Sequence, residues 1–362
     1  MIPTLVIFLA GCSALQERMV VDYRYETGNP ATLDSLLEQL ADKRVIFVGE
    51  THTRLDHHQL QLALLKALHD QGRELAVGAE WFQFPFQKPL DDFVAGRIPD
   101  AEMLALSGYY DRWRFDYRLY RPILDFARQH RIPVVALNAP AELIDAIREH
   151  GLEGLPAEFR NQAPSTYDRS NALYETRLRH VFGMHANKNG NFERFVDIQL
   201  TWDETMAEQA ARYLERHPEK TLVIFAGAGH IAYGDGIPDR LERRTPLRAA
   251  TVLPHMPGMK DRSIADYIVA TANAEELPRS GLLGLFLDQT ADGLVVKNFS
   301  ESSTAQAAGL RKGDVLVAVE DQPTPHLAAL KLALLDRVPG DTVTVAYRRG
   351  SARNGRATVE LK

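Results

Sequence analysis

The chain contains a single cysteine, Cys12, among its 362 residues. It cannot form an internal disulfide, so an oxidising compartment would leave no trace in its composition. Basic residues are not in excess either: 42 lysines and arginines stand against 48 acidic residues, for a formal net charge of −6. Because nucleic acid binding depends on a basic surface, we expect no nucleic acid partner. The apolar stretch at residues 5–9 is much shorter than the about 20 residues that cross a bilayer as a helix.

The same stretch is followed by Ala10, Gly11 and Cys12. This pattern resembles a bacterial lipoprotein signal, which implies a diacylated Cys12 that anchors the protein to a membrane surface. Ser13 after it implies the outer membrane of a Gram-negative cell envelope, facing the periplasm. The first four residues carry no basic side chain, so either the true start lies upstream or the signal is atypical. The alternative is an apolar N-terminal strand with a buried cysteine.

Two segments share one pattern, an apolar run that stops at Gly-x-x-His. They are residues 44–52 and 221–230. Such a run predicts a strand buried on both faces, as parallel sheets require. Ligands of open α/β sheets bind at the carboxyl ends of strands, so we expect His52 and His230 to face each other at one edge of the sheet. A third apolar run ends on Glu80, which we expect at the same edge.

Apolar runs alternate with helical patterns through most of the chain. This predicts an α/β fold, with a mostly parallel sheet flanked by helices and right-handed crossovers. A helical insert rich in aromatic residues interrupts the alternation. Beyond residues 273–281 the pattern changes to short strands and glycine turns, which predicts a separate β-rich domain. The expected parts are a signal segment (1–12), a tether (13–30), an α/β domain (31–274) and a C-terminal domain (278–362).

Residues 303–316 contain the motif Ala-Ala-Gly-Leu-Arg-Lys-Gly-Asp-Val-Leu. It is similar to the signature of bacterial PDZ domains, and the resemblance extends over residues 278–362. A PDZ domain implies a protein partner with a free C-terminus. The partner's carboxylate would meet backbone N–H groups of one loop, and the following strand edge would accept the peptide as an added strand. That loop consists of Leu283, Gly284, Leu285 and Phe286.

The polar residues at the strand ends suggest metal chemistry. Imidazole and carboxylate are common metal ligands, so His52, His230 and Glu80 are candidates for a divalent metal ion. Glu50 would then orient His52 or act as a general base. The alternative is that both histidines are merely solvated or hydrogen-bonded, and that Glu80 caps a helix.

Six segments together resemble the ChaN family of haem-binding, iron-regulated lipoproteins, over about residues 40–255. This resemblance implies haem as the cofactor and a role in iron acquisition. The wider superfamily includes Tiki proteins, which are metal-dependent peptidases, so a Tiki-like hydrolase is the alternative. The segments are residues 48–53, 80–83, 120–124, 136–140, 203–207 and 227–238.

Haem requires an apolar slot, an axial donor and often a cation for its propionates. The axial candidates are His52, His230 and Tyr233, and Arg54 or Arg112 would meet the propionates. Aromatic residues of the insert are candidates for the slot, although such residues also form ordinary cores: Tyr109, Tyr110, Trp113 and Phe115.

We therefore expect a membrane-anchored haem-binding protein for haem and iron uptake, which is not itself an enzyme. Its PDZ domain would bind a protein partner, and a homodimer is one expected assembly. The alternative is a hydrolase that uses His52, His230 and Glu80 as metal ligands and Glu50 as base. A third reading is a scaffold in which only the PDZ domain remains functional.

Overall fold

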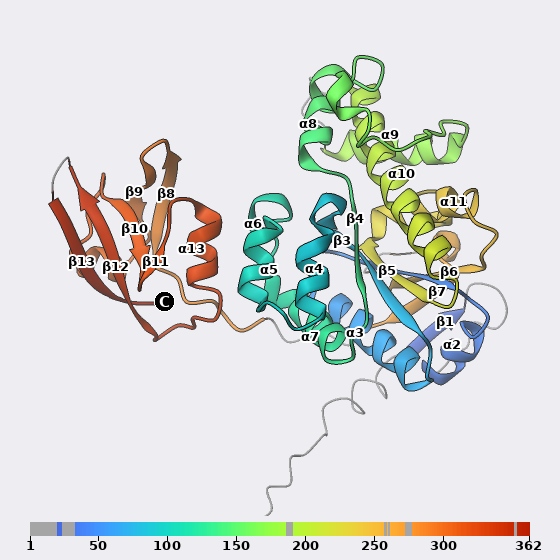
Figure 1. Cartoon of the computed structure of the whole chain (residues 1–362), viewed down its shortest axis with the longest axis horizontal. Helices are drawn as coiled ribbons and strands as arrows, with labels where there is room; N and C mark the ends of the chain where they lie inside the picture. The colour runs from blue at the N-terminus through green and yellow to red at the C-terminus, as the bar shows by residue number, and fades with distance from the viewer. Residues whose placement is uncertain are drawn as a thin grey trace, which may run out of the picture. The chain divides into compact units, whose positions relative to one another are not determined.

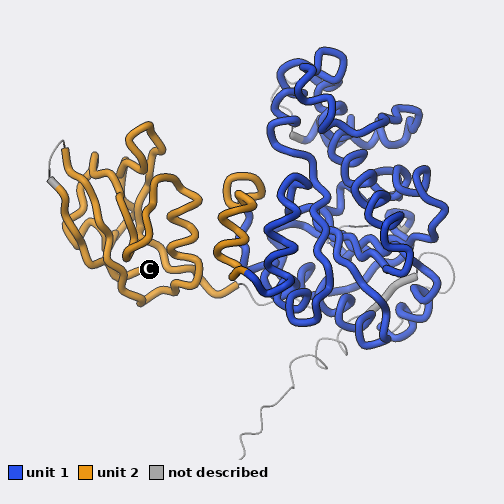
Figure 2. The backbone as a smooth tube through the Cα atoms, in the orientation of Figure 1, with its two compact units in different colours: residues 1–97, 115–275 blue, residues 98–114, 276–362 orange. Residues whose placement is uncertain are grey.

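The computed structural model describes residues 20–23, 33–185, 191–256, 259, 261–271, 277–350 and 353–362. They form two compact units (Figure 2). Unit 1 comprises residues up to 97 and 115–275, and unit 2 comprises residues 98–114 and 276–362. The division at residue 275 falls within the expected boundary region. The sequence did not predict that residues 98–114 belong to unit 2. Cys12 and most of the expected tether lie outside the described residues.

Unit 1 is built on a seven-stranded sheet with the order β1-β7-β6-β2-β5-β3-β4 (Figure 1). All neighbouring pairs are parallel except β1, which pairs antiparallel with β7 at the edge. The mostly parallel sheet predicted from the sequence is therefore confirmed. The strands are β1 (Val20–Tyr23), β2 (Val45–Glu50), β3 (Leu75–Gln83), β4 (Val134–Asn138), β5 (Thr221–Gly227), β6 (Ala249–Pro254) and β7 (Tyr267–Ala270).

The order of the strands explains where a ligand site would form. After β2 the chain crosses through α3 to β3, and after β5 it crosses in the opposite direction through α11 to β6. Right-handed crossovers place these two helices on opposite faces of the sheet. Because β2 and β5 are neighbours, a crevice opens at their carboxyl ends, where α/β sheets bind ligands. Both Gly-x-x-His segments reach this point.

The helices of unit 1 cover the two faces of the sheet. The longest, α10 (Phe192–Arg216), packs with α11 (Ile237–Glu242) on the core formed by β2, β4 and β5. All residues of β2 and β5 are buried, which is why these strands consist of continuous apolar runs. The remaining helices and turns are α2 (Leu33–Gln39), α3 (Leu55–Asp70), η1 (Phe84–Phe86), α4 (Gln87–Val94), η2 (Tyr117–Leu119), α7 (Arg121–Gln129), α8 (Ala141–His150), η3 (Ala157–Phe159), α9 (Ala172–His185), η4 (Ala228–His230), η5 (Ala232–Gly234) and η6 (Arg262–Ile264).

Unit 2 contains an antiparallel sheet with the order β13-β12-β10-β9-β8, in which β11 also pairs with β10. Strand β8 lies at the edge of this sheet. The helices α5 and α6 of residues 98–114 contact α13 of the same unit. The elements are α5 (Asp100–Leu106), α6 (Tyr109–Arg112), β8 (Leu285–Thr290), β9 (Gly293–Phe299), α12 (Thr304–Ala307), β10 (Val315–Val319), β11 (Gln322–Pro323), α13 (Leu327–Ala333), β12 (Thr342–Arg349) and β13 (Arg353–Glu360).

Two details of unit 1 differ from the sequence prediction. Residues 20–23 lie in the expected tether but form β1, with Val20 opposite Ala270 and Tyr23 opposite Tyr267. Glu80 was expected at the end of its strand but lies inside β3, which continues to Gln83. Within the described ranges, no helix is both long and apolar enough to cross a membrane.

Candidate functional site

The two histidines predicted to converge do so beside Gly227, the last residue of β5. In the sheet register Glu50 of β2 stands opposite Gly227. The backbone N–H of Gly227 donates to Glu80 Oε2 of β3 at 2.6 Å. A Cβ atom at position 227 would lie only 2.9 Å from His52 Cε1 and 3.6 Å from Glu80 Oε2. Glycine is therefore required there for His52 and Glu80 to approach β5 from its two sides.

The His52 side of the site is held by two polar residues close in sequence and by two aromatic residues from farther along the chain. His52 Nδ1 lies 2.9 Å from Glu50 Oε1, and Gln61 of α3 donates to Glu50 Oε2 at 2.8 Å. The ring of Phe115 packs against the His52 ring with a centroid distance of 4.7 Å. Tyr120 places its hydroxyl 3.4 Å from Glu50 Oε1 and 3.3 Å from the His52 carbonyl oxygen. His52 remains 29% exposed at its side chain, whereas Glu50 is fully buried.

The His230 side is more enclosed and is held by distant residues. His230 Nδ1 lies 2.5 Å from Asp203 Oδ1 of α10, and its Nε2 lies 3.4 Å from Glu80 Oε1. The hydroxyl of Tyr174 in α9 donates to the other Asp203 oxygen at 2.7 Å. Each of the two imidazoles thus has its Nδ1 on a buried carboxylate. Such pairing fixes the ring and leaves Nε2 as the atom that faces the site.

The charges at the site shift the pKa of both histidines. Burial alone would lower the pKa of His230, but the carboxylates of Asp203 and Glu80 outweigh burial and raise it to about 9. Burial likewise opposes protonation of His52, yet its hydrogen bond to Glu50 and the charge of Glu80 raise its pKa. The site therefore favours a charged imidazolium at His230 at neutral pH, and its carboxylates also favour the charged form of His52 against burial.

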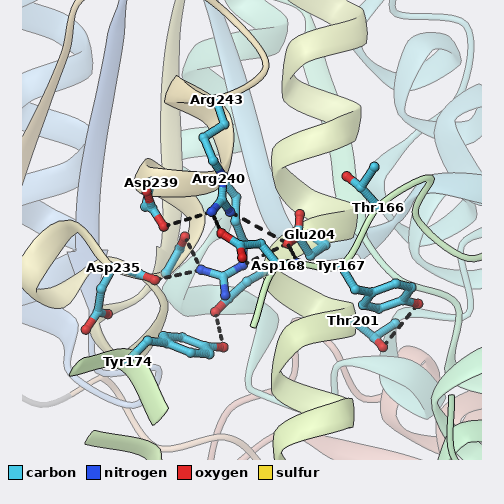
Figure 3. A network of polar contacts seen from close by, with 12 residues as sticks. Thr166, Tyr167, Asp168, Tyr174, Thr201, Glu204, Asp235, Asp239, Arg240 and Arg243 are labelled. Carbon is cyan, nitrogen blue, oxygen red and sulfur yellow. Dashed lines mark hydrogen bonds and ion pairs between the residues drawn. The ribbon is translucent and has the colours of Figure 1, made fainter. Parts of the chain in front are cut away.

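Behind His230, a buried ion network fixes the loop that carries it (Figure 3). Arg240 of α11 is fully buried, and its Nη1 donates to the carbonyl oxygens of Asp235 and Gly236 at 2.6 and 2.9 Å. Its guanidinium lies 4.3 Å from the centre of the Tyr174 ring, and its Nε lies 3.4 Å from Glu204 of α10. Arginine inside a domain requires such partners, because a buried unpaired charge is strongly destabilising. The network therefore ties α9, α10 and α11 to the loop at residues 228–236.

A cavity of about 820 Å³ opens beside this loop. Leu173, Thr176, Arg177 and His180 of α9 form one wall, and residues of β6 and α11 form the others. Arg177 is paired with Asp235 and also donates to the Gly229 carbonyl oxygen at 2.9 Å. The same arginine thus joins the cavity wall to the turn that carries His230.

Tyr233 lies at this cavity and has an unusual conformation. Its backbone φ is +61°, in the left-handed region that aromatic residues rarely adopt. The side chain is 45% exposed. Burial of part of the ring and the nearby Asp261 carboxylate raise the pKa of its phenol, which hydrogen-bonds to Asp261. A strained backbone that presents an exposed phenol to a cavity is typical of a binding residue.

The four aromatic residues expected to form a slot are distributed over both units. Of its four residues, Phe115 belongs to unit 1 and packs on His52. Tyr109, Tyr110 and Trp113 belong to unit 2. The cavity beside Tyr233 is instead lined mainly by aliphatic and polar side chains.

Of the two arginines expected to meet propionates, Arg54 belongs to unit 1 and Arg112 to unit 2. Arg54 forms two hydrogen bonds to Asp56, at 2.8 and 2.7 Å. Arg112 ends α6 in unit 2. Within unit 1, Arg177 and His180 are the basic side chains that line the cavity.

A preformed metal centre is not evident at the strand ends. Among the residues that the structure describes, no group of three or more histidine, cysteine or acidic side chains is placed to hold a metal ion. His52, His230 and Glu80 lie close together, but His230 Nε2 contacts Glu80 directly.

In unit 2, the loop before β8 has the conformation expected for carboxylate binding. Gly284 has φ +67°, and a Cβ there would lie 2.8 Å from Ser300 Oγ. Its carbonyl oxygen accepts from the Ser300 N–H at 3.0 Å, which fixes the turn. Within the described residues, the N–H groups of Leu283 and Gly284 have no acceptor. Unpaired N–H groups at such a turn are suited to an anion.

Asp203, Tyr174 and Arg177 were not identified as site residues from the sequence. Asp203 appeared only within a segment that resembles ChaN, and it lies 27 residues from its partner His230. A carboxylate on one face of a long helix carries no sequence signal of its own. In the structure Asp203 is buried on α10. An acidic residue at a position of a helix that is expected to be buried is the one indication that a sequence search could use.

Comparisons with known proteins agree with these features. A model of the family described as "Haem-binding uptake, Tiki superfamily, ChaN" matches residues 36–241, and a PDZ domain model matches residues 281–361. A solved structure described as cofacial heme binding to ChaN of Campylobacter jejuni aligns with a TM-score of 0.57 at 17% identity, covering 70% of this chain and 97% of that chain.

Two further solved structures align less closely. The HtrA3 PDZ domain bound to a phage-derived ligand covers 23% of this chain and 85% of its own, at 18% identity and a TM-score of 0.20. An erythromycin esterase mutant in its open conformation covers 68% of this chain and 80% of its own, at 13% identity and a TM-score of 0.39. No curated protein matches. The chain belongs to the ChaN family of the Tiki superfamily and carries a C-terminal PDZ domain.

Proposed function

We propose that the protein binds haem in the cavity beside Tyr233, with the Tyr233 phenol as the axial ligand of the iron. The strained and exposed Tyr233 is the observation that carries this proposal. The cavity, of about 820 Å³, lies within the usual range of about 300–1,000 Å³ for small-molecule sites. Leu173 and Pro238 offer apolar contact, Arg177 supplies positive charge for propionates, and His180 offers a hydrogen bond. When bound, haem supplies an iron centre that accepts a phenolate oxygen.

His52 and His230 are weaker candidates for the axial position. Each has its Nδ1 on a carboxylate, and His230 Nε2 also contacts Glu80. A protonated imidazole has no lone pair for iron, and the pKa of His230 is about 9. Asp261, which accepts a hydrogen bond from the Tyr233 phenol, would take its proton when the phenolate binds iron.

Titration of the full chain with hemin tests this assignment. We expect a saturable Soret change, and we expect Tyr233→Phe to weaken hemin binding at least tenfold. Tyr213→Phe is the matched control, because it removes a buried hydroxyl that has no hydrogen-bond partner. A titration without saturation would overturn the haem proposal. Loss of binding in His230→Gln but not in Tyr233→Phe would move the axial ligand to His230.

We further propose that the protein serves haem and iron uptake in the cell envelope, anchored to the outer membrane through a lipidated Cys12 and facing the periplasm. The support is the sequence around Cys12 together with family membership. Replacing Cys12 with serine should release the protein from membranes. Unchanged membrane association of that variant would contradict the anchor. Poor growth on haem as the iron source after deletion of the gene would support the uptake role.

We propose that unit 2 binds the C-terminus of a protein partner. The unpaired N–H groups of Leu283 and Gly284 would meet the terminal carboxylate, and the peptide would add to the edge strand β8. Free-acid and amidated forms of peptides ending in valine or leucine test this. Only the free acids should bind, and Gly284→Ala should abolish binding because its backbone has φ +67°. Equal binding of amidated peptides would contradict the carboxylate site.

A second candidate function is metal-dependent hydrolysis at the strand ends. It is favoured by one observation: two imidazoles, each backed by a carboxylate, lie near Glu80, which His230 Nε2 contacts at 3.4 Å and whose charge raises the pKa of His52. In this case His52, His230 and Glu80 would hold a divalent ion, and Glu50 would act as base. Hydrolysis of peptide or ester substrates that requires Zn²⁺ or Mn²⁺ and disappears in His230→Gln would establish it. Stoichiometric hemin binding without any such activity would exclude this function.

A further inference from the structure

We infer that residues 109–120, here called the connecting segment, couple the peptide site of the PDZ domain to the surroundings of His52. This inference concerns regulation and rests on the proposed functions of the two domains. The segment begins in unit 2 with α6 and ends in unit 1 at Tyr120. One continuous stretch of chain therefore has contacts at both sites.

The unit 2 end of the segment packs on α13. Both α5 and α6 contact α13, and Lys331 Nζ of α13 lies 5.2 Å from the centre of the Tyr110 ring in α6. A cation over an aromatic face is attracted by the negative face of the ring, so this contact favours the packing of α6 on α13. Residues 98–114 group with the PDZ domain in one compact unit although they belong to the ChaN part of the sequence (Figure 2).

The same helix α13 also adjoins the strand where a peptide would bind. The backbone N–H of Leu327, the first residue of α13, donates to Gln289 Oε1 of β8 at 3.2 Å. β8 is the edge strand of its sheet, and PDZ domains bind peptides by adding a strand at such an edge. A peptide bound along β8 would therefore lie beside α13, and α13 is the helix that α5 and α6 also contact.

The unit 1 end of the segment surrounds the first histidine. The Phe115 ring lies 4.7 Å from the His52 ring. Tyr120 hydrogen-bonds to Glu50 and to the His52 carbonyl oxygen, and its ring lies 4.5 Å from that of His58. Tyr110 and Phe115 are separated by only four residues. A shift of α6 along α13 would thus be passed by a short piece of chain to the aromatic wall of His52.

Arg114 lies between these two contacts and has φ +72°. Its N–H closes the last turn of α6 on the Tyr109 carbonyl oxygen at 3.2 Å. The left-handed conformation after a helix is usually occupied by glycine, and an arginine there is strained. The strained position makes the direction in which the chain leaves α6 well defined, which a coupling segment requires.

The test follows the imidazole signal of His52 by NMR in the full chain labelled with ¹⁵N-histidine, assigned with His52→Gln. Tyr110→Ala and Lys331→Ala should each shift the His52 signal. Lys297→Ala is the matched control, since Lys297 is also an exposed lysine of unit 2 but pairs with Asp288. Unshifted His52 signals in both variants, as in the control, would overturn the inference regardless of whether haem or peptide binds.

A second measurement uses hemin and a free-acid peptide ending in valine. Thermodynamic linkage requires that the peptide change hemin affinity by the same factor as hemin changes peptide affinity. Glu80 links His52 to the haem side, because its charge acts on His52 and it contacts His230 in the loop that carries Tyr233. We therefore expect a factor of at least three, reduced toward one in Arg114→Gly, which relaxes the strained link. If both ligands bind and the factor is one, the coupling is wrong while both proposed functions stand. Failure of either ligand to bind is a failure of that function, and the His52 signal then decides the coupling.

Discussion

The two Gly-x-x-His segments have the same sequence pattern, but the structure holds their histidines in different ways. His52 pairs with Glu50, two residues earlier, and its chain continues directly into the 16-residue helix α3. His230 pairs with Asp203 on another helix, and its chain continues through a turn with Tyr233 in the left-handed region. The carboxylate of the first histidine is thus supplied locally. That of the second is supplied by a tertiary contact, and the second segment also contains a strained residue. This difference suggests that ligand binding lies on the second side.

The largest test of this comparison removes the carboxylate behind each histidine. Asp203→Asn should lower the free energy of unfolding by about 3 kcal/mol, because it leaves an enclosed imidazolium without its charged partner. Glu50→Gln should cost about 2 kcal/mol, since water still reaches His52. Urea unfolding at pH 7 measures both. A larger loss in Glu50→Gln would contradict the view that the second side depends more on its carboxylate.

The pH dependence of stability separates the two histidines next. The pKa of His230 is raised from an unfolded value of 6.5 to about 9. A raised pKa means that its stabilisation is fully present below pH 6.5 and is lost as the pH rises through about 9. The free energy of unfolding should therefore fall by roughly 3 kcal/mol between pH 6 and pH 10. In His230→Gln this part of the fall should disappear, and a wild-type stability that does not change over this range would refute it.

A smaller effect is expected at Tyr233. Asparagine tolerates the left-handed region better than tyrosine, so Tyr233→Asn should raise the free energy of unfolding by about 0.5–1 kcal/mol while it abolishes high-affinity hemin binding. Thermal unfolding and hemin titration of the same sample measure the two effects. Leu55 occupies the corresponding position after His52, in α3, and Leu55→Asn should only destabilise. A stability loss in Tyr233→Asn would mean that the tyrosine has a packing role instead.

The smallest effect is expected at Arg54, which follows the first histidine. Arg54 is 44% exposed in its pair with the buried Asp56. Side-chain hydrogen bonds from Arg54 and Thr271 outweigh the burial of Asp56 and lower its pKa to about 2. Arg54→Gln should reduce the free energy of unfolding by about 0.5 kcal/mol. Hemin affinity should change less than twofold if haem lies beside Tyr233. A tenfold loss of hemin affinity would instead place the propionates near His52.

The fold and part of the site were predictable from the sequence for a common reason. Buried parallel strands require continuous apolar runs, so β2, β3 and β5 could be recognised, and their carboxyl ends share one edge. The sequence therefore predicted that His52, His230 and Glu80 lie close together. The same was not possible for Asp203, because its partnership depends on how α10 crosses the sheet. The conformation of Tyr233 and the grouping of residues 98–114 with the PDZ domain also depend on three-dimensional contacts.

The antiparallel pairing of β1 with β7 has a consequence for an anchored protein. The chain joins the sheet at Val20, and eight residue steps separate Val20 from Cys12. At about 3.5 Å for each step, an acylated Cys12 would hold the sheet edge within about 28 Å of the lipid surface. The tether between Cys12 and the sheet is therefore shorter than the expected residues 13–30. A soluble version that begins at residue 31 would lack β1, so the edge of β7 would be unpaired and prone to strand-to-strand aggregation.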